Sequence, residues 1–167
     1  MNTASTSIAV KHNIEVAHRL FELPGKCEQI HGHSMWVTME LFGNVNSKGI
    51  LAGIEYGDLK KTFRTYLDET YDHRLLLNAS DPFARPIFQI HDAEQDDYRG
   101  FYVVPDHKQI FLPGLQSMPG DPTTENIAKW IGEEMLQQLD GYGLEMLHVT
   151  VWETGVNMAT YAQGFTS

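Results

Sequence analysis

The sequence is poor in cysteine and in long apolar stretches. Cys27 is the only cysteine among 167 residues, which makes an intrachain disulfide impossible, and a single thiol suits a reducing cytosol or a chemical role better than secretion. No apolar run approaches the roughly 20 residues that a membrane-spanning helix needs. The N-terminal segment MNTASTSIAVKHN lacks the basic and apolar regions of a signal peptide. We therefore expect a soluble, cytoplasmic protein that does not associate with membranes.

Positive charge is also scarce. The chain has 12 Lys and Arg against 22 Asp and Glu, for a formal net charge of −10, which works against a general attraction to nucleic acid or to anionic membranes. An anionic substrate would need locally concentrated cations. The length and the 42% hydrophobic content predict a single domain over residues 1–167 with its own core.

Hydrophobic periodicity changes twice along the chain. Near both ends of the chain, apolar and polar residues alternate, as in strands. In two segments between these ends, apolar residues recur every three or four positions, which is typical of helices. Pro122 with Thr123-Thr124 marks the start of the second helix, and Gly-Tyr-Gly at 141–143 ends it. We expect strands over 5–20, 34–44, 147–152 and 158–165, and helices over 56–68 and 124–139.

The segment 79–119 differs from the rest of the chain. It holds five of the seven prolines and an acidic run over 91–100 that separates two mixed stretches, 87–90 and 101–111. We interpret it as an inserted loop or hairpin.

His31-Gly32-His33 is the first pattern that indicates chemistry. On a strand, residues i and i+2 point to the same face, and the intervening glycine removes a side chain that could crowd a bound ion. Alone, such a pair is more often two ordinary polar strand residues. Catalytic zinc usually takes three protein ligands and keeps one open position, and His18, near the end of the preceding strand, is the best-placed third ligand.

Cys27 lies in the loop over 24–30, four residues before His31 and beside Lys26. A nearby cation or metal ion would lower the pKa of its thiol from the usual value of about 8.5. The thiol could be a fourth ligand that closes a structural site, or a thiolate base beside an open one. Spacing alone does not choose between them.

Two further acidic positions are candidates. Asp72 next to His73 could orient the imidazole for proton transfer, although most Asp-His pairs are surface residues. Glu153, at the end of a strand, could accept two parallel N–H bonds from a heterocycle, and an exposed strand-end glutamate is the equally simple alternative. The other histidines have no comparable partners in sequence: His12, His91, His107 and His148.

Six motifs in order carry a resemblance to a known family. They are Ala-His-Arg-Leu (17–20), Cys-x3-His-Gly-His (27–33), Gly-Asp-Leu-Lys (57–60), Asp-His-Arg (72–74), Pro-Thr-x-Glu-Asn-x-Ala (122–128) and Glu-Thr (153–154). Together they resemble the 6-pyruvoyltetrahydropterin synthase family, which includes the 6-carboxytetrahydropterin synthases. The insert at 79–119 and Glu55-Tyr56, where the family has Asp-Phe, depart from its pattern.

The resemblance implies a T-fold: a four-stranded antiparallel sheet with two helices on one face, in ββααββ order with an insert around 79–119. It also implies a homohexamer of two trimers, with active sites between subunits. Such an assembly would pair the sheet edges that a lone sheet leaves open.

The resemblance assigns roles residue by residue. His18, His31 and His33 would hold Zn²⁺, Cys27 would be the proton-abstracting base, Asp72 with His73 would form a second proton-transfer pair, and Glu153 would anchor the pterin. The implied substrate is 7,8-dihydroneopterin triphosphate, whose side-chain hydroxyls a zinc ion would acidify. Lys26 or Arg19 could meet the triphosphate.

The three-residue gap between Cys27 and His31 resembles the bacterial carboxy-forming enzymes, which release acetaldehyde and triphosphate and feed 7-deazaguanine and queuosine synthesis. Rival hypotheses are a pyruvoyl-forming synthase, an aldolase-like activity that gives 6-hydroxymethylpterin, and a catalytically silent zinc or pterin binder. The base and the relay together argue against the silent binder.

Overall fold

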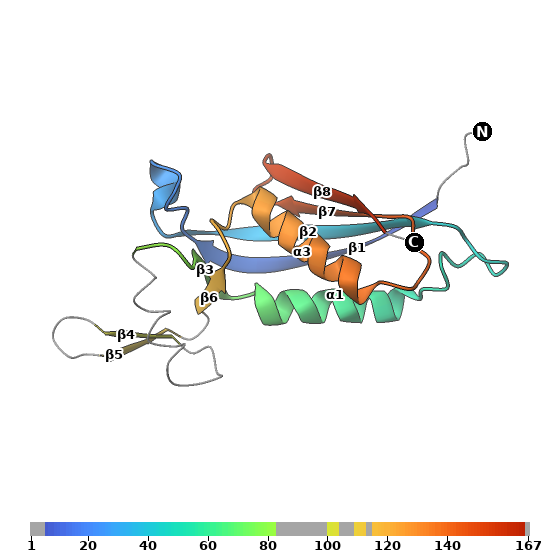
Figure 1. Ribbon diagram of the computed structural model, residues 1–167, viewed down its shortest axis with the longest axis horizontal. Coiled ribbons are helices and arrows are strands. Elements are labelled where there is room, and N and C mark those ends of the chain that lie inside the picture. Colours follow the sequence, from blue (N-terminus) through green and yellow to red (C-terminus); the bar gives the residue numbers. More distant parts are fainter. Residues whose placement is uncertain (1–5, 83–99, 104–108, 113–114, 166–167) are drawn as a thin grey trace. The chain divides into compact units, whose positions relative to one another are not determined.

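The structure is a computed structural model, and it describes residues 6–82, 100–103, 109–112 and 115–165. Figure 1 shows its elements. In chain order they are β1 (Thr6–His18), the 3-10 turn η1 (Lys26–Glu28), β2 (His31–Gly43), α1 (Tyr56–Thr70), β3 (Arg74–Asn78), β4 (Gly100–Val103), β5 (Gln109–Leu112), β6 (Leu115–Met118), α3 (Thr124–Gln138), β7 (Met146–Trp152) and β8 (Met158–Gly164).

The main sheet has six strands in the order β6-β3-β1-β2-β7-β8. β7 is antiparallel to β2 and to β8, as expected, but β3 runs parallel to β1, and β6 runs parallel to β3. The prediction of a four-stranded antiparallel sheet is therefore wrong. The physical reason lies in Leu75–Leu77, an uninterrupted apolar run whose last two residues are fully buried, which is typical of a parallel strand rather than of a loop.

The chain divides into two compact units. Unit 1 comprises Met1–Ile14, Ser34–Glu69 and Thr124–Ser167, and unit 2 comprises Glu15–His33 and Thr70–Thr123. The single domain predicted for residues 1–167 stays a prediction.

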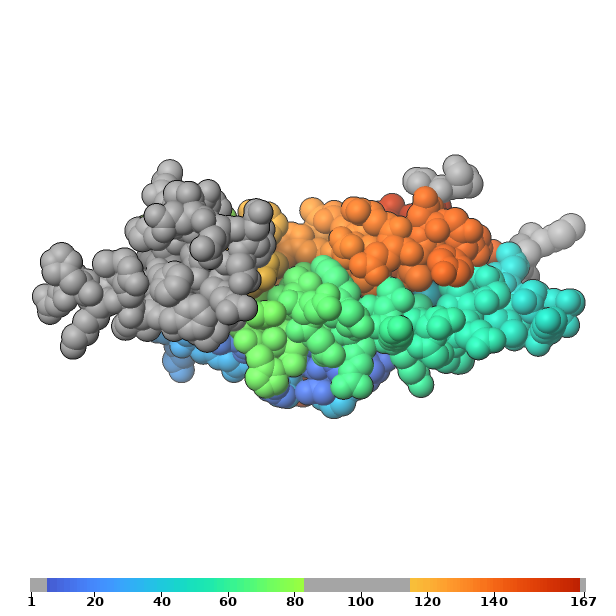
Figure 2. Space-filling view, turned by 90° about the horizontal axis from the view of Figure 1, so that it is seen from below, coloured from blue at the N-terminus to red at the C-terminus, as the bar shows by residue number. Residues whose placement is uncertain are grey.

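The core of unit 1 lies between its two helices and one face of its strands. Alternate residues of β2 are fully buried, while Trp36 on the opposite face is 45% exposed. α3 packs on β7 and β8, and Figures 1 and 2 show α1 and α3 side by side. Since only one strand face is buried, both helices cover that face, as expected. The apolar residues that meet there include Met35, Val37, Met39 and Leu41 of β2, Leu59, Phe63 and Leu67 of α1, and Ile127, Ile131 and Met135 of α3.

The ends of the elements agree with their sequence signals to within a few residues. α3 begins at Thr124, and Gly141 and Gly143 after its end have φ of 83° and 73°, a backbone conformation that favours glycine. Among the described residues, no helix is long and apolar enough to cross a membrane.

The segment 79–119 is more than a loop. β4 and β5 form an antiparallel pair, in agreement with the expected hairpin, and β6 joins the main sheet. The predicted stretch 87–90 lies outside the described residues.

We predict that Gly132→Ala destabilises unit 1. A Cβ at Gly132 in α3 would meet the Tyr161 ring of β8 at 2.3 Å, and such overpacking costs about 1–3 kcal/mol. Gly57→Ala is the matched control, because it also lies in a helix and a Cβ there meets nothing within 4 Å. Urea unfolding should show a lower free energy of unfolding for Gly132→Ala only. Equal stability of the two variants would contradict this packing.

Candidate metal centre

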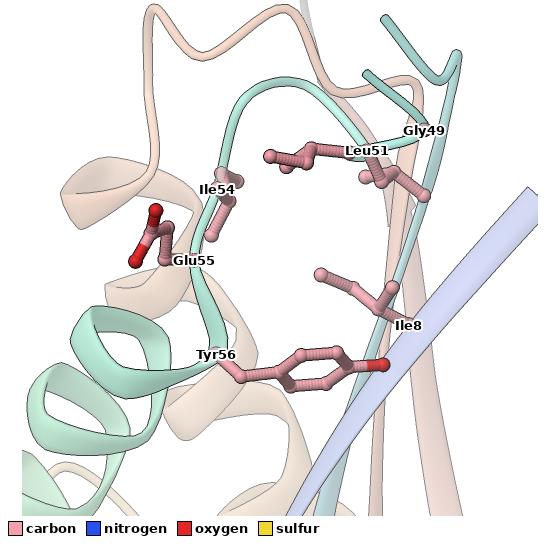
Figure 3. Close-up of a pocket in the computed structure, with 7 residues that line it drawn as sticks. Ile8, Gly49, Leu51, Ile54, Glu55 and Tyr56 are labelled. Atoms are coloured by element: carbon pink, nitrogen blue, oxygen red, sulfur yellow. The ribbon is translucent and has the colours of Figure 1, made fainter.

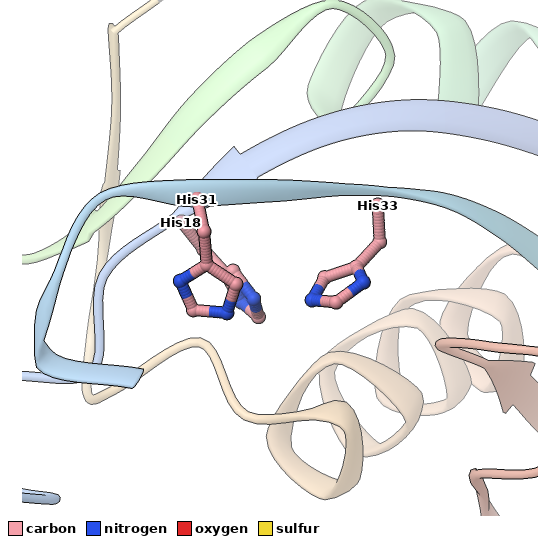
Figure 4. Close-up of side chains that lie close together, drawn as sticks. All are labelled: His18, His31 and His33. Atoms are coloured by element: carbon pink, nitrogen blue, oxygen red, sulfur yellow. The ribbon is translucent and has the colours of Figure 1, made fainter. Parts of the chain in front are cut away.

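Three histidines of unit 2 converge at the end of β1 and the start of β2. His18, His31 and His33 offer ligand atoms that all lie within 4.8 Å of one another (Figure 4). Their ring centroids are 4.5 to 5.2 Å apart. The structure thus brings together the three residues that the sequence nominated as metal ligands.

Two backbone carbonyls determine the tautomer of two of these rings. Nδ1 of His18 lies 2.8 Å from the carbonyl oxygen of Pro122, and Nδ1 of His31 lies 2.8 Å from that of Gln29. A carbonyl can only accept a hydrogen bond, so each Nδ1 carries the proton, and the lone pair of each neutral ring is on Nε2. Metal-ligating histidines are commonly oriented in this way.

The surroundings of the rings fit a bound cation. His18 is fully buried, and His31 and His33 are half-buried. Nε2 of His18 and Nε2 of His33 are enclosed and form no hydrogen bond with any described residue, although both histidines have other interactions. Three neutral imidazoles suit Zn²⁺ and other divalent transition metals. The cluster could therefore hold a metal ion.

Glycine is required at position 32 for a different reason from the one that the sequence suggested. A Cβ at this position would lie 2.8 Å from the carbonyl oxygen of Val16, closer than real Cβ contacts come. Since alternate strand residues point to opposite faces, this side chain would not crowd an ion held by His31 and His33. Glycine is needed here because β1 and β2 approach each other closely beside the histidines.

Cys27 lies in η1, between the two strands that carry the histidines. It is a half-buried free thiol, and its carbonyl accepts a hydrogen bond from the backbone N–H of Leu20 at 3.0 Å. Among the described residues, the group of convergent ligand atoms consists of the three histidines and does not include this thiol.

Asp72 and His73 form a hydrogen-bonded pair in unit 2. His73 Nδ1 lies 2.7 Å from Asp72 Oδ2, and Asp72 Oδ1 accepts the backbone N–H of Glu15 at 2.8 Å. The His73 ring is mostly exposed, and its backbone has φ of 56°, a left-handed conformation that costs a non-glycine residue about 1–3 kcal/mol. Glu15 precedes His18 by three residues, so this contact lies about 10 Å along β1 from the cluster.

Glu153 lies in unit 1, directly after β7. Its carboxylate Oε1 accepts a hydrogen bond of 3.1 Å from the hydroxyl of Thr124, the first residue of α3, and its backbone N–H donates to Asn157. The positive end of a helix stabilises a carboxylate in such a place. This contact gives the strand-end glutamate a fixed, half-buried position rather than a freely solvated one.

Sequence reasoning missed the residues that support the cluster. Asp121 accepts hydrogen bonds from the side chain of Asn78 at 3.0 Å and from the backbone N–H of Glu22 at 2.9 Å, next to the Pro122 carbonyl. Arg19 forms an ion pair with the buried Asp81. No spacing rule points to these contacts, and the available signals were the two motifs that contain Arg19 and Pro122.

A separate pocket in unit 1 has no such chemistry. It has a volume of about 290 Å³ and is lined by apolar side chains with the single carboxylate of Glu55 (Figure 3). None of the predicted site residues lines it. Glu55 and Tyr56, the pair that departs from the family pattern, form part of its wall.

Comparison with solved structures defines the fold. The structure superposes on an uncharacterized protein from Wolinella succinogenes with a TM-score of 0.74 and 18% identity, covering 95% of this chain and 98% of that one. It superposes on a variant of 6-pyruvoyltetrahydropterin synthase from Plasmodium vivax with a TM-score of 0.70 and 19% identity, covering 97% and 99%. The expected T-fold is thus confirmed, with a larger sheet than predicted.

Comparison with known sequences defines the family. The profile of the 6-pyruvoyl tetrahydropterin synthase family matches residues 7–164, so the chain belongs to this family. The putative 6-carboxy-5,6,7,8-tetrahydropterin synthase of Pyrococcus abyssi is 28% identical over 137 residues, which cover 79% of this chain and 73% of that protein. The 6-carboxy-5,6,7,8-tetrahydropterin synthase of Rickettsia conorii is 31% identical over 68 residues, and this match covers 40% of this chain and 48% of the relative.

We predict that metal binding stabilises the fold through His33. Free Zn²⁺ at 100 times its Kd should raise the free energy of unfolding by about 2.7 kcal/mol, because the unfolded chain lacks the site. His33→Ala should lose both the bound zinc, measured by elemental analysis, and the zinc-dependent rise in Tm. His148→Ala, in β7 of unit 1, is the control and should keep both. Retention of zinc by His33→Ala would contradict the assignment.

Proposed function

We propose that the chain is a zinc-dependent lyase that converts 7,8-dihydroneopterin triphosphate to 6-carboxy-5,6,7,8-tetrahydropterin, acetaldehyde and triphosphate. The observation that carries the proposal is the cluster of His18, His31 and His33, with Nε2 of His18 and of His31 set as the metal-facing atom. Membership of a pterin synthase family supports a pterin as the substrate class.

The carboxy-forming branch has two supports. Curated relatives carry that name, and the chain has three residues between Cys27 and His31. A rival product, 6-pyruvoyltetrahydropterin or 6-hydroxymethylpterin, would leave the ligands and base assigned to this chain unchanged, and a silent zinc or pterin binder would form none of the three.

Within this proposal, a bound zinc ion supplies Lewis acidity that lowers the pKa of the substrate's side-chain hydroxyls. Cys27 abstracts a proton as a thiolate, and its absence from the convergent ligand group supports this role over that of a fourth ligand. His73 donates Nδ1–H to Asp72, so its exposed Nε2 is the atom that takes or returns the second proton.

Glu153 binds the pterin ring in this scheme. Its carboxylate is held at the start of α3 by Thr124, which restricts how it can present its oxygens to an amidine-like edge. A fixed carboxylate loses less conformational entropy on binding than a solvated one.

The proposal extends to the location, the pathway and the assembly of the enzyme. The enzyme would act in the cytoplasm and supply 7-deazaguanine and queuosine synthesis. It would assemble as a hexamer of two trimers, which would pair the outer strands β6 and β8 of the sheet. Sedimentation analysis would test the assembly.

We predict that the zinc-loaded protein yields a carboxy product, identified by mass, together with acetaldehyde. Cys27→Ala should abolish turnover and keep its zinc, because it removes the base and no ligand. A pyruvoyl or hydroxymethyl product would overturn the branch, and no conversion would favour the silent binder. Loss of zinc and a lower Tm in Cys27→Ala would show instead that Cys27 is a ligand of a structural site.

We predict that Glu153→Gln raises KM for the pterin substrate about tenfold or more, since the amide presents one acceptor and no charge where the carboxylate presents two oxygens. Zinc content should not change. Glu145→Gln is the matched control, because Glu145 is an exposed residue just before β7 that accepts a hydrogen bond from Asn44. Steady-state kinetics with equal KM for both variants would contradict the role of Glu153.

A further inference from the structure

Arg19, the residue after the ligand His18, connects three parts of unit 2. Its Nη1 pairs with the carboxylate of Asp81, its Nε donates to the carbonyl of Glu28 at 2.7 Å, and its Nη2 lies 3.5 Å from the Glu28 carboxylate. Glu28 is the last residue of η1 and follows Cys27 directly. One guanidinium therefore joins the turn that carries Cys27 to a residue at the start of the 79–119 segment.

Within the described part of unit 2, few other contacts hold the turn. None of the residues of η1 is buried, no side chain caps it, and Gly25 before it has φ of 117°. Without a buried side chain, the hydrophobic effect contributes little to placing the turn. Among the described residues, the turn is joined to the chain just after β1 by the hydrogen bond from the Leu20 N–H to the Cys27 carbonyl and by the contacts of Arg19 with Glu28.

The partner of Arg19 at the other end is buried. Asp81 is fully buried and the Arg19 side chain is 18% exposed. Separating the partners of a buried ion pair leaves an uncompensated charge, which is strongly unfavourable. Asp81 and Glu28 engage part of the planar fork of Arg19, and the expectation that Lys26 or Arg19 meets the substrate's triphosphate stays a prediction.

We propose that Arg19 is a positioning residue that holds the Cys27 turn against the end of β1, with Asp81 as its buried anchor. The inference rests on the proposed role of Cys27 as the base. A thiolate that must reach one substrate proton needs a fixed placement, and a displacement of about 1 Å can cost about 100-fold in rate.

Arg19→Gln tests the proposal, with Arg64→Gln as the matched control, because Arg64 forms an exposed ion pair with Asp68 four residues away in α1. The chain has one cysteine, so the rate of alkylation by iodoacetamide reports Cys27 alone. Alkylation of the zinc-loaded protein should be several-fold faster in Arg19→Gln than in Arg64→Gln. The kcat should fall about 10- to 100-fold with little change in KM or zinc content.

Other outcomes overturn the proposal. Unchanged alkylation and kcat would show that the turn holds its place without Arg19. A higher KM with unchanged alkylation would show that Arg19 contacts the substrate instead. If wild-type protein converts no pterin, the proposed function fails, and the alkylation rates still decide whether Arg19 holds the turn.

Arg19→Lys keeps the test valid if Arg19→Gln does not fold. The lysine keeps a cation opposite Asp81, and its single ammonium cannot also bridge to the Glu28 carbonyl as the guanidinium fork does. Alkylation faster than in wild-type protein would support the proposal, and an equal rate would overturn it.

Discussion

The candidate metal centre depends on the hydrogen bond between Nδ1 of buried His18 and the carbonyl of Pro122. These residues are 104 positions apart, so the bond forms only when the chain before α3 returns to the end of β1. Asp121 holds that returning chain through Asn78 and the backbone of Glu22. Loss of this hydrogen bond would leave a buried ring nitrogen unsatisfied, at a cost of about 1–3 kcal/mol. It would also remove the contact that keeps the proton on Nδ1 and the lone pair on Nε2.

The close approach of Gly32 to Val16 is the second constraint on the same site. It sets the distance between β1 and β2 where their histidines face each other. Metal binding to such a site is coupled to folding, because the three imidazoles come together only in the folded unit. The contacts of Arg19 with Asp81 and Glu28 connect the end of β1, where His18 lies, to the turn that carries the thiol.

The grouping of the three histidines could be predicted because strand periodicity puts residues i and i+2 on one face, and because the motif around His18 has a family counterpart. The Pro122 carbonyl and the Asp81 anchor could not. A backbone acceptor has no residue-type signature, and Arg19 and Asp81 are 62 positions apart. β3 was missed because the run Leu75–Leu77 has no alternation, and the purpose of Gly32 was misjudged because the approach of two strands is invisible along one of them.

The most direct test of an open three-histidine site is X-ray absorption spectroscopy at the zinc edge of the zinc-loaded protein. We predict a shell of nitrogen or oxygen atoms at about 2.0–2.1 Å that includes three imidazoles and no sulfur. A sulfur atom at about 2.3 Å would contradict it, because Cys27 would then close the site as a fourth ligand.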